Sequence, residues 1–423
     1  MQSKQSDYLL NQEDTKTLVE KLDVAEKKKK RKEKGEKEGK QWLIMLIVGT
    51  LGLAGGITCI IVALLVQIDN DTQIAFPQVT SDMDSDDVKY SKLTGEKLAD
   101  ASTIDAPTYC IQTPNGTDGA RPQAGLTQAG VVFEAIAEAG ITRFAAIYQN
   151  PIGTIIGPIR SLRIYYLEWD TPFDCTIVHA GGADDAIAAL SAGGYRNLDE
   201  SYSYMYRGTA GARLWNNLFT TSSHLKRFNQ DHGYDTSDVK GFARMTPEES
   251  EKARIDELVK ERLTITKPTE ADTAKIEAKV TNVSLKLGGW ASYNIDYTYD
   301  AESNKYLRSY ESGAPHEVYN CNLDEPGEQN PEAVCDLVQL APSVVVAMKV
   351  QEGRAWDNYH EDITTIGSGE AYIFQNGSVI QGTWDKPSRN EQIQFFDADG
   401  NAVRLAPGQT FVTAVPGYGT IDF

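Results

Sequence analysis

The stretch GARPQAGLTQAGVVFEAIAEAGITRFAAIYQNPIGTIIGPIRSLRIYYLEWDTPFDCTIVHAGG, residues 119–182, decides the fold of this 423-residue chain. It alternates apolar runs with glycine and proline turn signals, as expected for strands and helices that share one core. Four arginines stand at the edges of these runs, where planar guanidinium groups are able to converge on an anion through bidentate hydrogen bonds. The stretch therefore predicts the centre of an α/β domain with arginines at its rim.

The order of elements within this region favours an α/β unit. Val131–Gly140 has apolar residues at helical spacing and ends in glycine, so we predict a helix there. Ile141–Asn150 and Asp174–Gly182 have the composition of strands, and the second strand enters a Gly-Gly turn. Ala183–Gly194 predicts a short helix with two aspartates in its first turn, where the helix dipole favours carboxylates. Strand, glycine turn and helix in this order are typical of α/β proteins.

A longer helix is predicted at the close of this first domain. Residues 246–263 begin with a capping box made by Thr246 and Glu249, carry Pro247 at the first helical position and have basic residues in the last turns. This combination of start and stop signals predicts a soluble helix.

From about Ala278 the apolar period changes to two, which predicts strands. Alternating runs continue to the C-terminus, and Asn376-Gly377 and Asp399-Gly400 have the sequence of hairpin turns. The C-terminal part is therefore expected to be β-rich.

An uncharged stretch precedes both folded parts. Trp42–Ile68 holds no charged residue, and roughly 20 apolar residues suffice to cross a hydrocarbon core. Basic residues crowd the segment just before it, so the positive-inside rule places the N-terminus in the cytoplasm and the remainder outside the membrane. The expected organisation is a basic cytoplasmic tail (1–41), a transmembrane helix (42–68), an extracytoplasmic linker (69–104), an α/β or α+β domain (105–265) and a β-rich domain (275–423).

Charge excludes one class of partner. The chain has a formal net charge of -19, and the tail holds 12 of its 41 Lys and Arg and 9 of its 60 Asp and Glu. The uncharged span adds nothing, so the part after it carries 29 basic against 51 acidic groups. Such an acidic body would repel phosphates, which argues against nucleic-acid binding by the extracytoplasmic part.

The cysteines indicate disulfide chemistry rather than metal chemistry. Cys321 and Cys335 bracket a loop rich in turn residues, and we predict a disulfide between them. Cys110 and Cys175 either pair or remain ordinary core thiols. No Cys-x-x-Cys, clustered histidine, phosphate-binding loop, dinucleotide fingerprint or serine elbow occurs, so the sequence predicts no metal site and no cofactor.

The candidate ligand-binding residues are mostly basic and lie near turns. Two readings of the arginines remain open: an anion-binding site, or structural ion pairs with Glu134, Glu138 or Glu168. If the Gly-Pro-Ile-Arg segment is the first turn of a helix, its two arginines share one face of that helix. His179 is either an acid/base group or ligand contact, or a core residue whose ring nitrogens both have partners. The set is Arg121, Arg143, Arg160, Ser161, Arg163, His179, Arg207 and Arg213.

Several runs together resemble one family. ARPQAGL, ITRF, IGPIRSLR and IVHAGG, followed by GSGEAYIFQNGSVIQGTW and FFDADGNAVRLAPGQTF, are similar to the YerB-like family of bacterial envelope proteins, over roughly residues 105–423. The resemblance implies an N-terminal α/β domain and a C-terminal β domain at the outer face of the membrane, and it brings no established activity. The chain departs from the family in having an apolar span where members often have a lipobox cysteine, and an inserted loop between Cys321 and Cys335.

Two functions from different classes follow. The first is a noncatalytic envelope protein that binds an anionic glycan, a lipid headgroup or a protein partner through the arginines and the nearby tyrosines 202, 204 and 206. The second is an enzyme acting on phosphate-linked glycan or lipid precursors, with Asp184 or Glu134 holding a metal or acting as base. The two differ in whether Arg143, Arg160, Arg163 and an acidic residue line one cleft.

Overall fold

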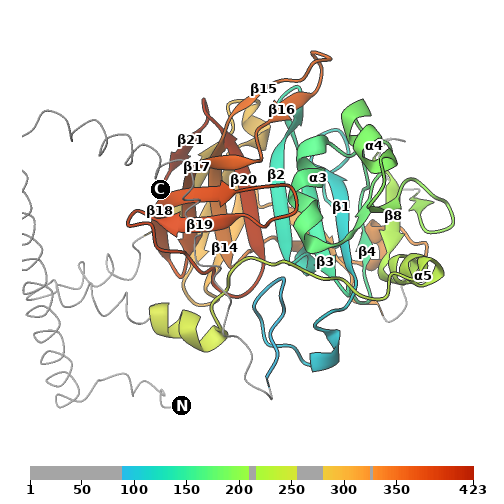
Figure 1. The fold of residues 1–423 in the computed structure, drawn as a ribbon, viewed down its shortest axis with the longest axis horizontal. Coiled ribbons are helices and arrows are strands. Elements are labelled where there is room, and N and C mark those ends of the chain that lie inside the picture. The colour runs from blue at the N-terminus through green and yellow to red at the C-terminus, as the bar shows by residue number, and fades with distance from the viewer. Residues whose placement is uncertain (1–87, 209–215, 255–279, 324–326) are drawn as a thin grey trace, which may run out of the picture. The chain divides into compact units, whose positions relative to one another are not determined.

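A computed structural model describes residues 88–208, 216–254, 280–323 and 327–423. A ten-stranded sheet runs through this part of the chain in the order β19-β18-β17-β14-β20-β2-β3-β1-β5-β6 (Figure 1). In that order the strands are Gln394–Asp397, Ser378–Lys386, Gly367–Gln375, Val344–Val350, Thr410–Pro416, Val131–Glu138, Ile141–Gln149, Thr108–Pro114, Thr176–Val178 and Arg196–Leu198.

The helix predicted for Val131–Gly140 is wrong, because these residues form strand β2. Seven of the eight residues of β2 are buried, since both faces of the sheet are covered. A strand buried on both faces reads as a continuous apolar run, and helical spacing is always contained in such a run. The neighbour β20, which pairs with β2 in parallel from Val131 to Glu134, lies far along the chain and cannot be inferred from local sequence.

Most strands of the large sheet run in one direction. β14, β20 and β2 are mutually parallel, and β1, β5 and β6 are mutually parallel. β3 is antiparallel to both β2 and β1, so it relates the two groups as parallel to each other. β17 is antiparallel to both β14 and β18, so β18 shares this direction, and the carboxyl ends of seven strands meet at the same edge of the sheet.

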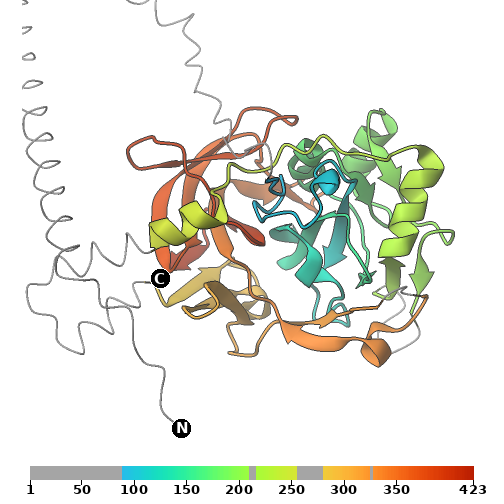
Figure 2. The ribbon, with the colours of Figure 1, turned by 90° about the horizontal axis from the view of Figure 1, so that it is seen from below.

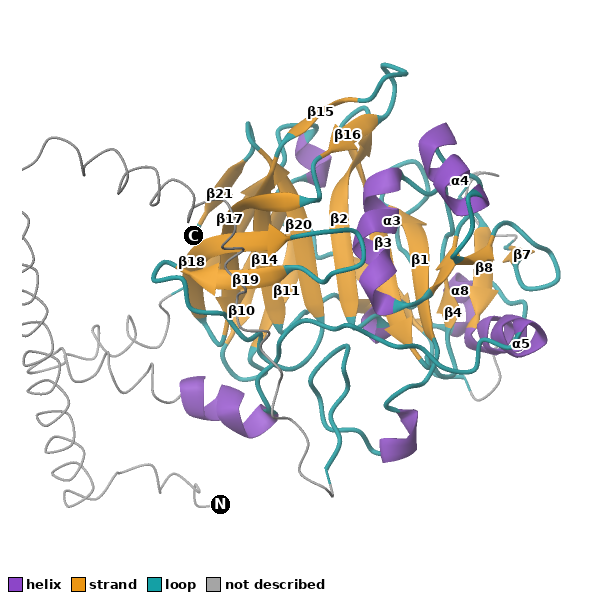
Figure 3. Ribbon diagram, in the orientation of Figure 1, coloured by secondary structure: helices purple, strands orange, loops and turns teal. Residues whose placement is uncertain are grey.

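Smaller sheets and helices cover the two faces. Figure 2 shows the small sheet β11-β10-β9-β21 against the C-terminal part of the large sheet, where their apolar residues share one core. Figure 3 shows how few helices accompany the strands. The remaining strands are β9 (Asn282–Lys286), β10 (Ile295–Asp300), β11 (Lys305–Tyr310), β21 (Thr420–Asp422), β12 (Glu317–Asn320), β13 (Asp336–Gln339), β15 (Glu352–Arg354), β16 (Glu361–Ile363), β4 (Ile155–Ile156), β7 (Tyr206–Arg207) and β8 (Leu218–Thr221).

Helices α3 (Ile164–Asp170) and α4 (Asp184–Ser191) lie on the opposite face, whereas α5 (Ser222–His232) packs on the face that carries the small sheet. The aromatic residues of α3 pack against β2 and β3, with Trp169 stacked on Phe133 at 5.2 Å between ring centroids. The helices with both ends among the described residues are α3 (Ile164–Asp170), α4 (Asp184–Ser191), α5 (Ser222–His232) and α8 (Pro331–Val334), with short 3-10 turns η1 (Ala101–Thr103), η2 (Leu126–Gln128), η3 (Thr171–Phe173) and η4 (Ala291–Tyr293).

Several local predictions are confirmed. The Ala183–Gly194 helix is α4, with its two aspartates in the first turn. Of the helix predicted over 246–263, residues 247–254 are helical, and Thr246 and Glu249 form the reciprocal capping-box hydrogen bonds at 2.9 and 3.1 Å. Residues 255–263 lie outside the described residues. At the β17–β18 turn, Asn376 and Gly377 have φ of 54° and 70°, the backbone that an Asn-Gly hairpin turn requires.

The helix considered for the Gly-Pro-Ile-Arg segment is not present. Helix α3 begins at Ile164, and Arg163 is its N-cap with extended backbone. The amide of Arg160 donates to Gln112, and its carbonyl accepts from Ala180, so the segment lies extended against the ends of neighbouring strands.

Two disulfides are present. Cys321–Cys335 confirms the predicted bond, and Cys110 pairs with Cys175. The second pair forms because β1 and β5 are parallel neighbours, with Cys110 opposite Ile177.

The predicted tail and span, residues 1–68, lie outside the described residues. Among the residues that are described, no helix combines the length and apolar character needed to cross a bilayer. Leu93, which the sequence assigns to the linker, is buried against the core, and its carbonyl accepts a hydrogen bond from Arg244 at 2.8 Å. The predicted combination of a mixed α/β N-terminal part and a β-rich C-terminal part is confirmed, and β2 and β20 join the two parts in one sheet.

Candidate functional site

The candidate site lies at the edge where the parallel strands end. In open α/β sheets, ligands bind outside the carboxyl ends of the strands. Glu352 and Tyr418 follow β14 and β20 at this edge, Ala139 follows β2, and His179 follows β5.

Arg143 and Arg163 lie at this edge and share one carboxylate. Glu138, at the end of β2, receives Nη2 of Arg143 at 2.8 Å and Nη2 of Arg163 at 2.5 Å. Burial alone would raise the pKa of Glu138, but the two guanidinium groups lower it below its ordinary value. Both arginine side chains are only 5% exposed, so in this structure they form buried ion pairs with Glu138 and are not open to an external anion.

Arg160 and Ser161 are half-buried beside this cluster. The carbonyl of Ser161 accepts a hydrogen bond from Arg143 at 2.6 Å. Burial lowers the pKa of Arg160, while the nearby carboxylates of Glu138 and Asp118 raise it. Of the predicted arginines at this edge, Arg160 is the most available to an external anion.

His179 is a core histidine in its contacts. The side chain is fully buried, with Nδ1 2.7 Å from the carbonyl oxygen of Gly181 and Nε2 2.8 Å from Oδ1 of Asn197. Both ring nitrogens have partners, which leaves neither directed at a cavity.

Arg207 lies on β7 in a surface network. Its guanidinium donates to Tyr202 at 2.9 Å, to Asn217 at 2.9 Å and to Glu200 at 2.5 Å. Arg213 lies outside the described residues.

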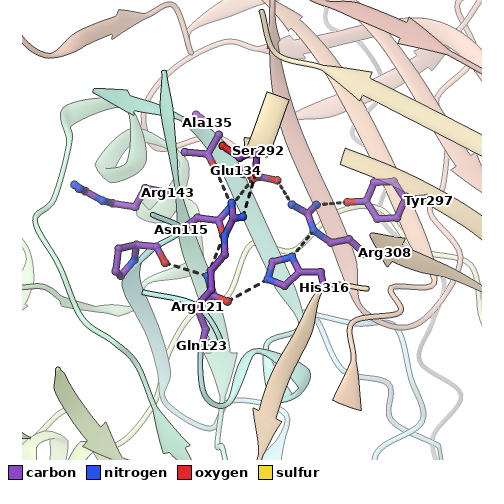
Figure 4. Close-up of polar contacts among 12 residues, drawn as sticks. Asn115, Arg121, Gln123, Glu134, Ala135, Arg143, Ser292, Tyr297, Arg308 and His316 are labelled. Carbon is purple, nitrogen blue, oxygen red and sulfur yellow. Dashed lines mark hydrogen bonds and ion pairs between the residues drawn. The ribbon is translucent and has the colours of Figure 1, made fainter. Parts of the chain in front are cut away.

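Arg121 belongs to a different cluster, the buried network drawn in Figure 4. Its Nε donates to Asn115 at 2.8 Å, its Nη1 donates to the carbonyl of Ser292 at 3.0 Å, and its guanidinium lies over the ring of Tyr310 at 4.1 Å. These contacts join the loop after β1 to the C-terminal part of the chain.

The centre of that network is an ion pair between Glu134 and Arg308. Nη2 of Arg308 lies 2.8 Å from Oε2 of Glu134, and both side chains are fully buried (Figure 4). Arg308 also donates to His316 at 2.9 Å and to the hydroxyl of Tyr297 at 2.5 Å. Because Arg308 donates to Nδ1 of His316, that ring is neutral, and burial lowers its pKa well below the ordinary value. The network links the two parts of the chain and is closed to solvent at its centre.

A cavity of about 520 Å³ opens at the same strand edge, beside the β15–β16 hairpin. Its walls include Trp290 and Tyr418, which are 67% and 61% exposed. Its polar groups are Glu352, Glu361 and Arg354. Large aromatic side chains left exposed around a concavity are typical of binding sites.

Glycines allow the aromatic walls to approach one another. Gly288 has φ of 76°, and a Cβ there would lie 2.3 Å from the ring of Tyr418. Gly140, also with φ of 76°, leaves room for Trp290, whose Nε1 donates to the carbonyl of Ala139 at 3.0 Å. Any side chain at Gly288 would therefore displace the cavity wall.

The carboxylate of Glu352 is only partly satisfied. Its Oε1 accepts a hydrogen bond from the hydroxyl of Tyr418 at 2.8 Å, and its Oε2 is buried with no hydrogen-bond partner. Burial raises the pKa of Glu352 to about 7, and the charge of Glu361 adds to the rise. The carboxyl group is thus poised between its two protonation states and lacks one partner.

The sequence reasoning missed this cavity. Its residues come from four separate segments, and each segment alone resembles a turn or a short strand. One local signal was present: Trp290 follows Gly288-Gly289, and Tyr418 stands between Gly417 and Gly419. Glycine-flanked aromatics in loops indicate a ring held close to backbone.

The comparisons with known proteins agree with the fold. The model of the N-terminal domain of a protein of unknown function (DUF3048) matches residues 93–235, and that of its C-terminal domain matches residues 285–412. The chain is 26% identical, over 336 residues, to the Bacillus subtilis protein named "Putative lipoprotein YerB", covering 77% of this chain and 85% of that protein.

A solved structure has the same fold. The crystal structure of YerB from Bacillus subtilis matches with a TM-score of 0.60 and 22% identity, over 79% of this chain and all of that chain. The resemblance read from the sequence is confirmed. With both domain models matched in order along one chain, this protein belongs to the YerB-like DUF3048 family.

Proposed function

We propose that this protein is an extracytoplasmic binding module of the bacterial envelope that holds a saccharide in the cavity beside the β15–β16 hairpin. The observation that carries the proposal is the pair of largely exposed aromatic side chains, Trp290 and Tyr418, on the walls of one cavity with Glu352. Sugar rings present apolar C–H faces that pack on aromatic rings, and their hydroxyl groups donate to carboxylates.

The proposed location has two supports. The relative in Bacillus subtilis is named "Putative lipoprotein YerB", a name that suits a protein attached at the outer face of a membrane. The two disulfides, Cys110–Cys175 and Cys321–Cys335, suit an oxidising compartment. The apolar stretch 42–68 would supply the anchor in place of a lipid.

The geometry favours a neutral or basic saccharide over an anionic one. The cavity carries two carboxylates and one guanidinium, and the guanidinium of Arg354 already donates to Asn358 at 3.0 Å. Arg143 and Arg163 are neutralised by Glu138, so an anionic ligand at this edge would depend on Arg160.

The enzyme alternative has less support. Glu134, one of the two carboxylates expected to act, is held by Arg308, Asn115 and Thr142. Asp184 lies in the first turn of α4. Within the described ranges no group of three or more His, Cys, Asp or Glu side chains has the arrangement of a metal site.

The test is calorimetric titration of the full chain, purified with detergent, with the tetramer of N-acetylglucosamine and with its fully de-N-acetylated counterpart. We expect Trp290→Ala to weaken binding at least tenfold. Trp356→Ala is the matched control, because Trp356 is 74% exposed and does not line the cavity. The proposal would be refuted if neither tetramer bound, or if Trp290→Ala and Trp356→Ala lost affinity equally.

A further inference from the structure

The cavity beside the β15–β16 hairpin has an unmatched negative character. Of its charged groups, Glu352 and Glu361 carry carboxylates and Arg354 carries the one guanidinium. Glu138, the next carboxylate along the edge, is already paired with two arginines and does not compete for a cation. An incoming ligand therefore meets an excess of acceptors.

One acceptor lacks a donor. Oε2 of Glu352 is buried without a hydrogen-bond partner, while Oε1 is held by Tyr418. A buried carboxylate oxygen left unpaired is costly, and a positive charge close to the carboxyl group offsets part of that cost. The Tyr418 hydrogen bond holds the carboxyl group at the cavity wall, where its charge acts on a ligand although Oε2 itself is buried.

The aromatic walls favour the same kind of group. The face of an indole or phenol ring attracts cations through its quadrupole, and the effect grows where water is partly excluded. Trp290 and Tyr418 offer such rings at the rim of a cavity that already contains carboxylates. Aromatic faces with an adjacent carboxylate are a recognised arrangement for binding ammonium groups.

Resting on the proposed saccharide function, we infer that the bound saccharide carries a primary ammonium group, which lies against Tyr418 and Trp290 beside the carboxyl groups of Glu352 and Glu361. The preferred ligand class is an amino sugar with a free amine rather than its N-acetylated form. N-acetylation removes the positive charge and replaces it by a neutral amide, so it removes the group that the site is built to hold.

The electrostatics of Glu352 agree with this assignment. Burial raises the pKa of Glu352 to about 7, which means that the empty cavity disfavours the ionised carboxylate. An ammonium group beside it favours the ionised form. Binding of an amine is then expected to lower that pKa, whereas binding of a neutral sugar is not.

The experiment compares two ligands that differ only in N-acetylation. Affinities of the full chain for the tetramer of glucosamine and the tetramer of N-acetylglucosamine are measured by calorimetry at low and at moderate salt. We expect the glucosamine tetramer to bind at least tenfold more tightly, with an advantage that shrinks as salt rises.

Glu352→Gln provides the test of position. It keeps the size of the side chain and an oxygen for the Tyr418 hydroxyl, and it should reduce the amine preference to less than threefold. Glu370→Gln is the charge-matched control, because Glu370 lines a separate cavity with Lys349 and Trp384. A melting curve checks that each variant is folded.

The outcomes separate this inference from the proposed function. Equal affinity for the two tetramers, with binding still dependent on Trp290, would overturn the ammonium assignment and leave saccharide binding standing. An amine preference that survives Glu352→Gln, or that is lost equally in Glu370→Gln, would also overturn it. Binding of neither tetramer would remove both proposals.

Discussion

Replacing Glu134 by glutamine should lower the free energy of unfolding by about 3–5 kcal/mol, the range for breaking a buried ion pair by removing one partner. The structure gives the reason. Oε2 of Glu134 lies 2.8 Å from Nη2 of Arg308, both side chains are fully buried, and Oε1 accepts from Thr142 and Asn115 at 2.9 and 3.2 Å. Glutamine has nearly the same shape, so the change removes the charge without opening a cavity.

Two costs combine in this variant. Arg308 keeps its positive charge in a solvent-free site, and its other partners, His316 and Tyr297, are both neutral. The new amide group also brings two N–H donors to a position where all three neighbours donate. A surface pair has neither cost, because water screens the charges and satisfies the donors.

The measurement is urea unfolding of the full chain, followed by circular dichroism and tryptophan fluorescence. Asp105→Asn is the control. Asp105 pairs with Lys92 at 2.8 Å, but the side chains of Lys92 and Asp105 are 35% and 54% exposed, so the loss of unfolding free energy in this variant should stay below about 1 kcal/mol. The double variant Glu134→Gln/Arg308→Met should be more stable than the sum of the single effects predicts. A loss for Glu134→Gln no larger than that of the control would refute the reasoning.

Three further variants test other features. Burial raises the pKa of Asp170 well above its ordinary value. Above about pH 4 the folded protein therefore binds a proton that the unfolded chain does not, and the stability of the fold falls as pH rises. Asp170→Asn removes this dependence, so its melting temperature should exceed that of the wild type at pH 8, by a margin that narrows towards pH 4. Gly288→Ala should displace the tyrosine in the cavity wall and weaken saccharide binding at least tenfold, whereas Gly313→Ala, with similar φ and nothing within 4 Å, should not. Arg163→Ala should cost about 2 kcal/mol of stability in denaturant titrations and Arg160→Ala less than about 0.5 kcal/mol, and equal effects would contradict the ion-pair assignment.

Features set by a few neighbouring residues could be predicted from the sequence. The Asn376-Gly377 hairpin turn, the capping box at Thr246 and the Cys321–Cys335 loop all depend on chemistry within fifteen residues. The strand β2 could not be predicted in the same way. Its neighbour β20 lies almost 280 residues away. The residues that cover the two faces of β2 belong to two hydrophobic clusters drawn from distant parts of the chain.

In the candidate site, too, features set by neighbouring residues could be predicted and features set by distant segments could not. Glycine-proline turns and positions at the ends of apolar runs mark Arg143, Arg160 and Arg163 as candidates but leave open whether they lie together, and the structure brings them to the same edge. Which carboxylate would pair with them depended on how β2 and β3 align, and that alignment brings Glu138 opposite Ile141. The aromatic cavity needed four segments to be placed together, which no spacing along the chain reveals.

The charge of the body bears on which ligand this edge can hold. After the uncharged span the chain carries 29 basic and 51 acidic groups, so its field attracts cations and repels polyanions at distances comparable to the Debye length. An anionic polymer would need a local basic pocket to overcome that field, and two of the arginines at the edge are already neutralised by Glu138. A ligand with an ammonium group meets no such opposition, because the long-range field and the carboxyl groups of Glu352 and Glu361 in the cavity wall both favour it. High salt should therefore slow the association of an amino sugar and leave that of its N-acetylated form nearly unchanged, and the opposite salt dependence would point back to Arg160 and an anion.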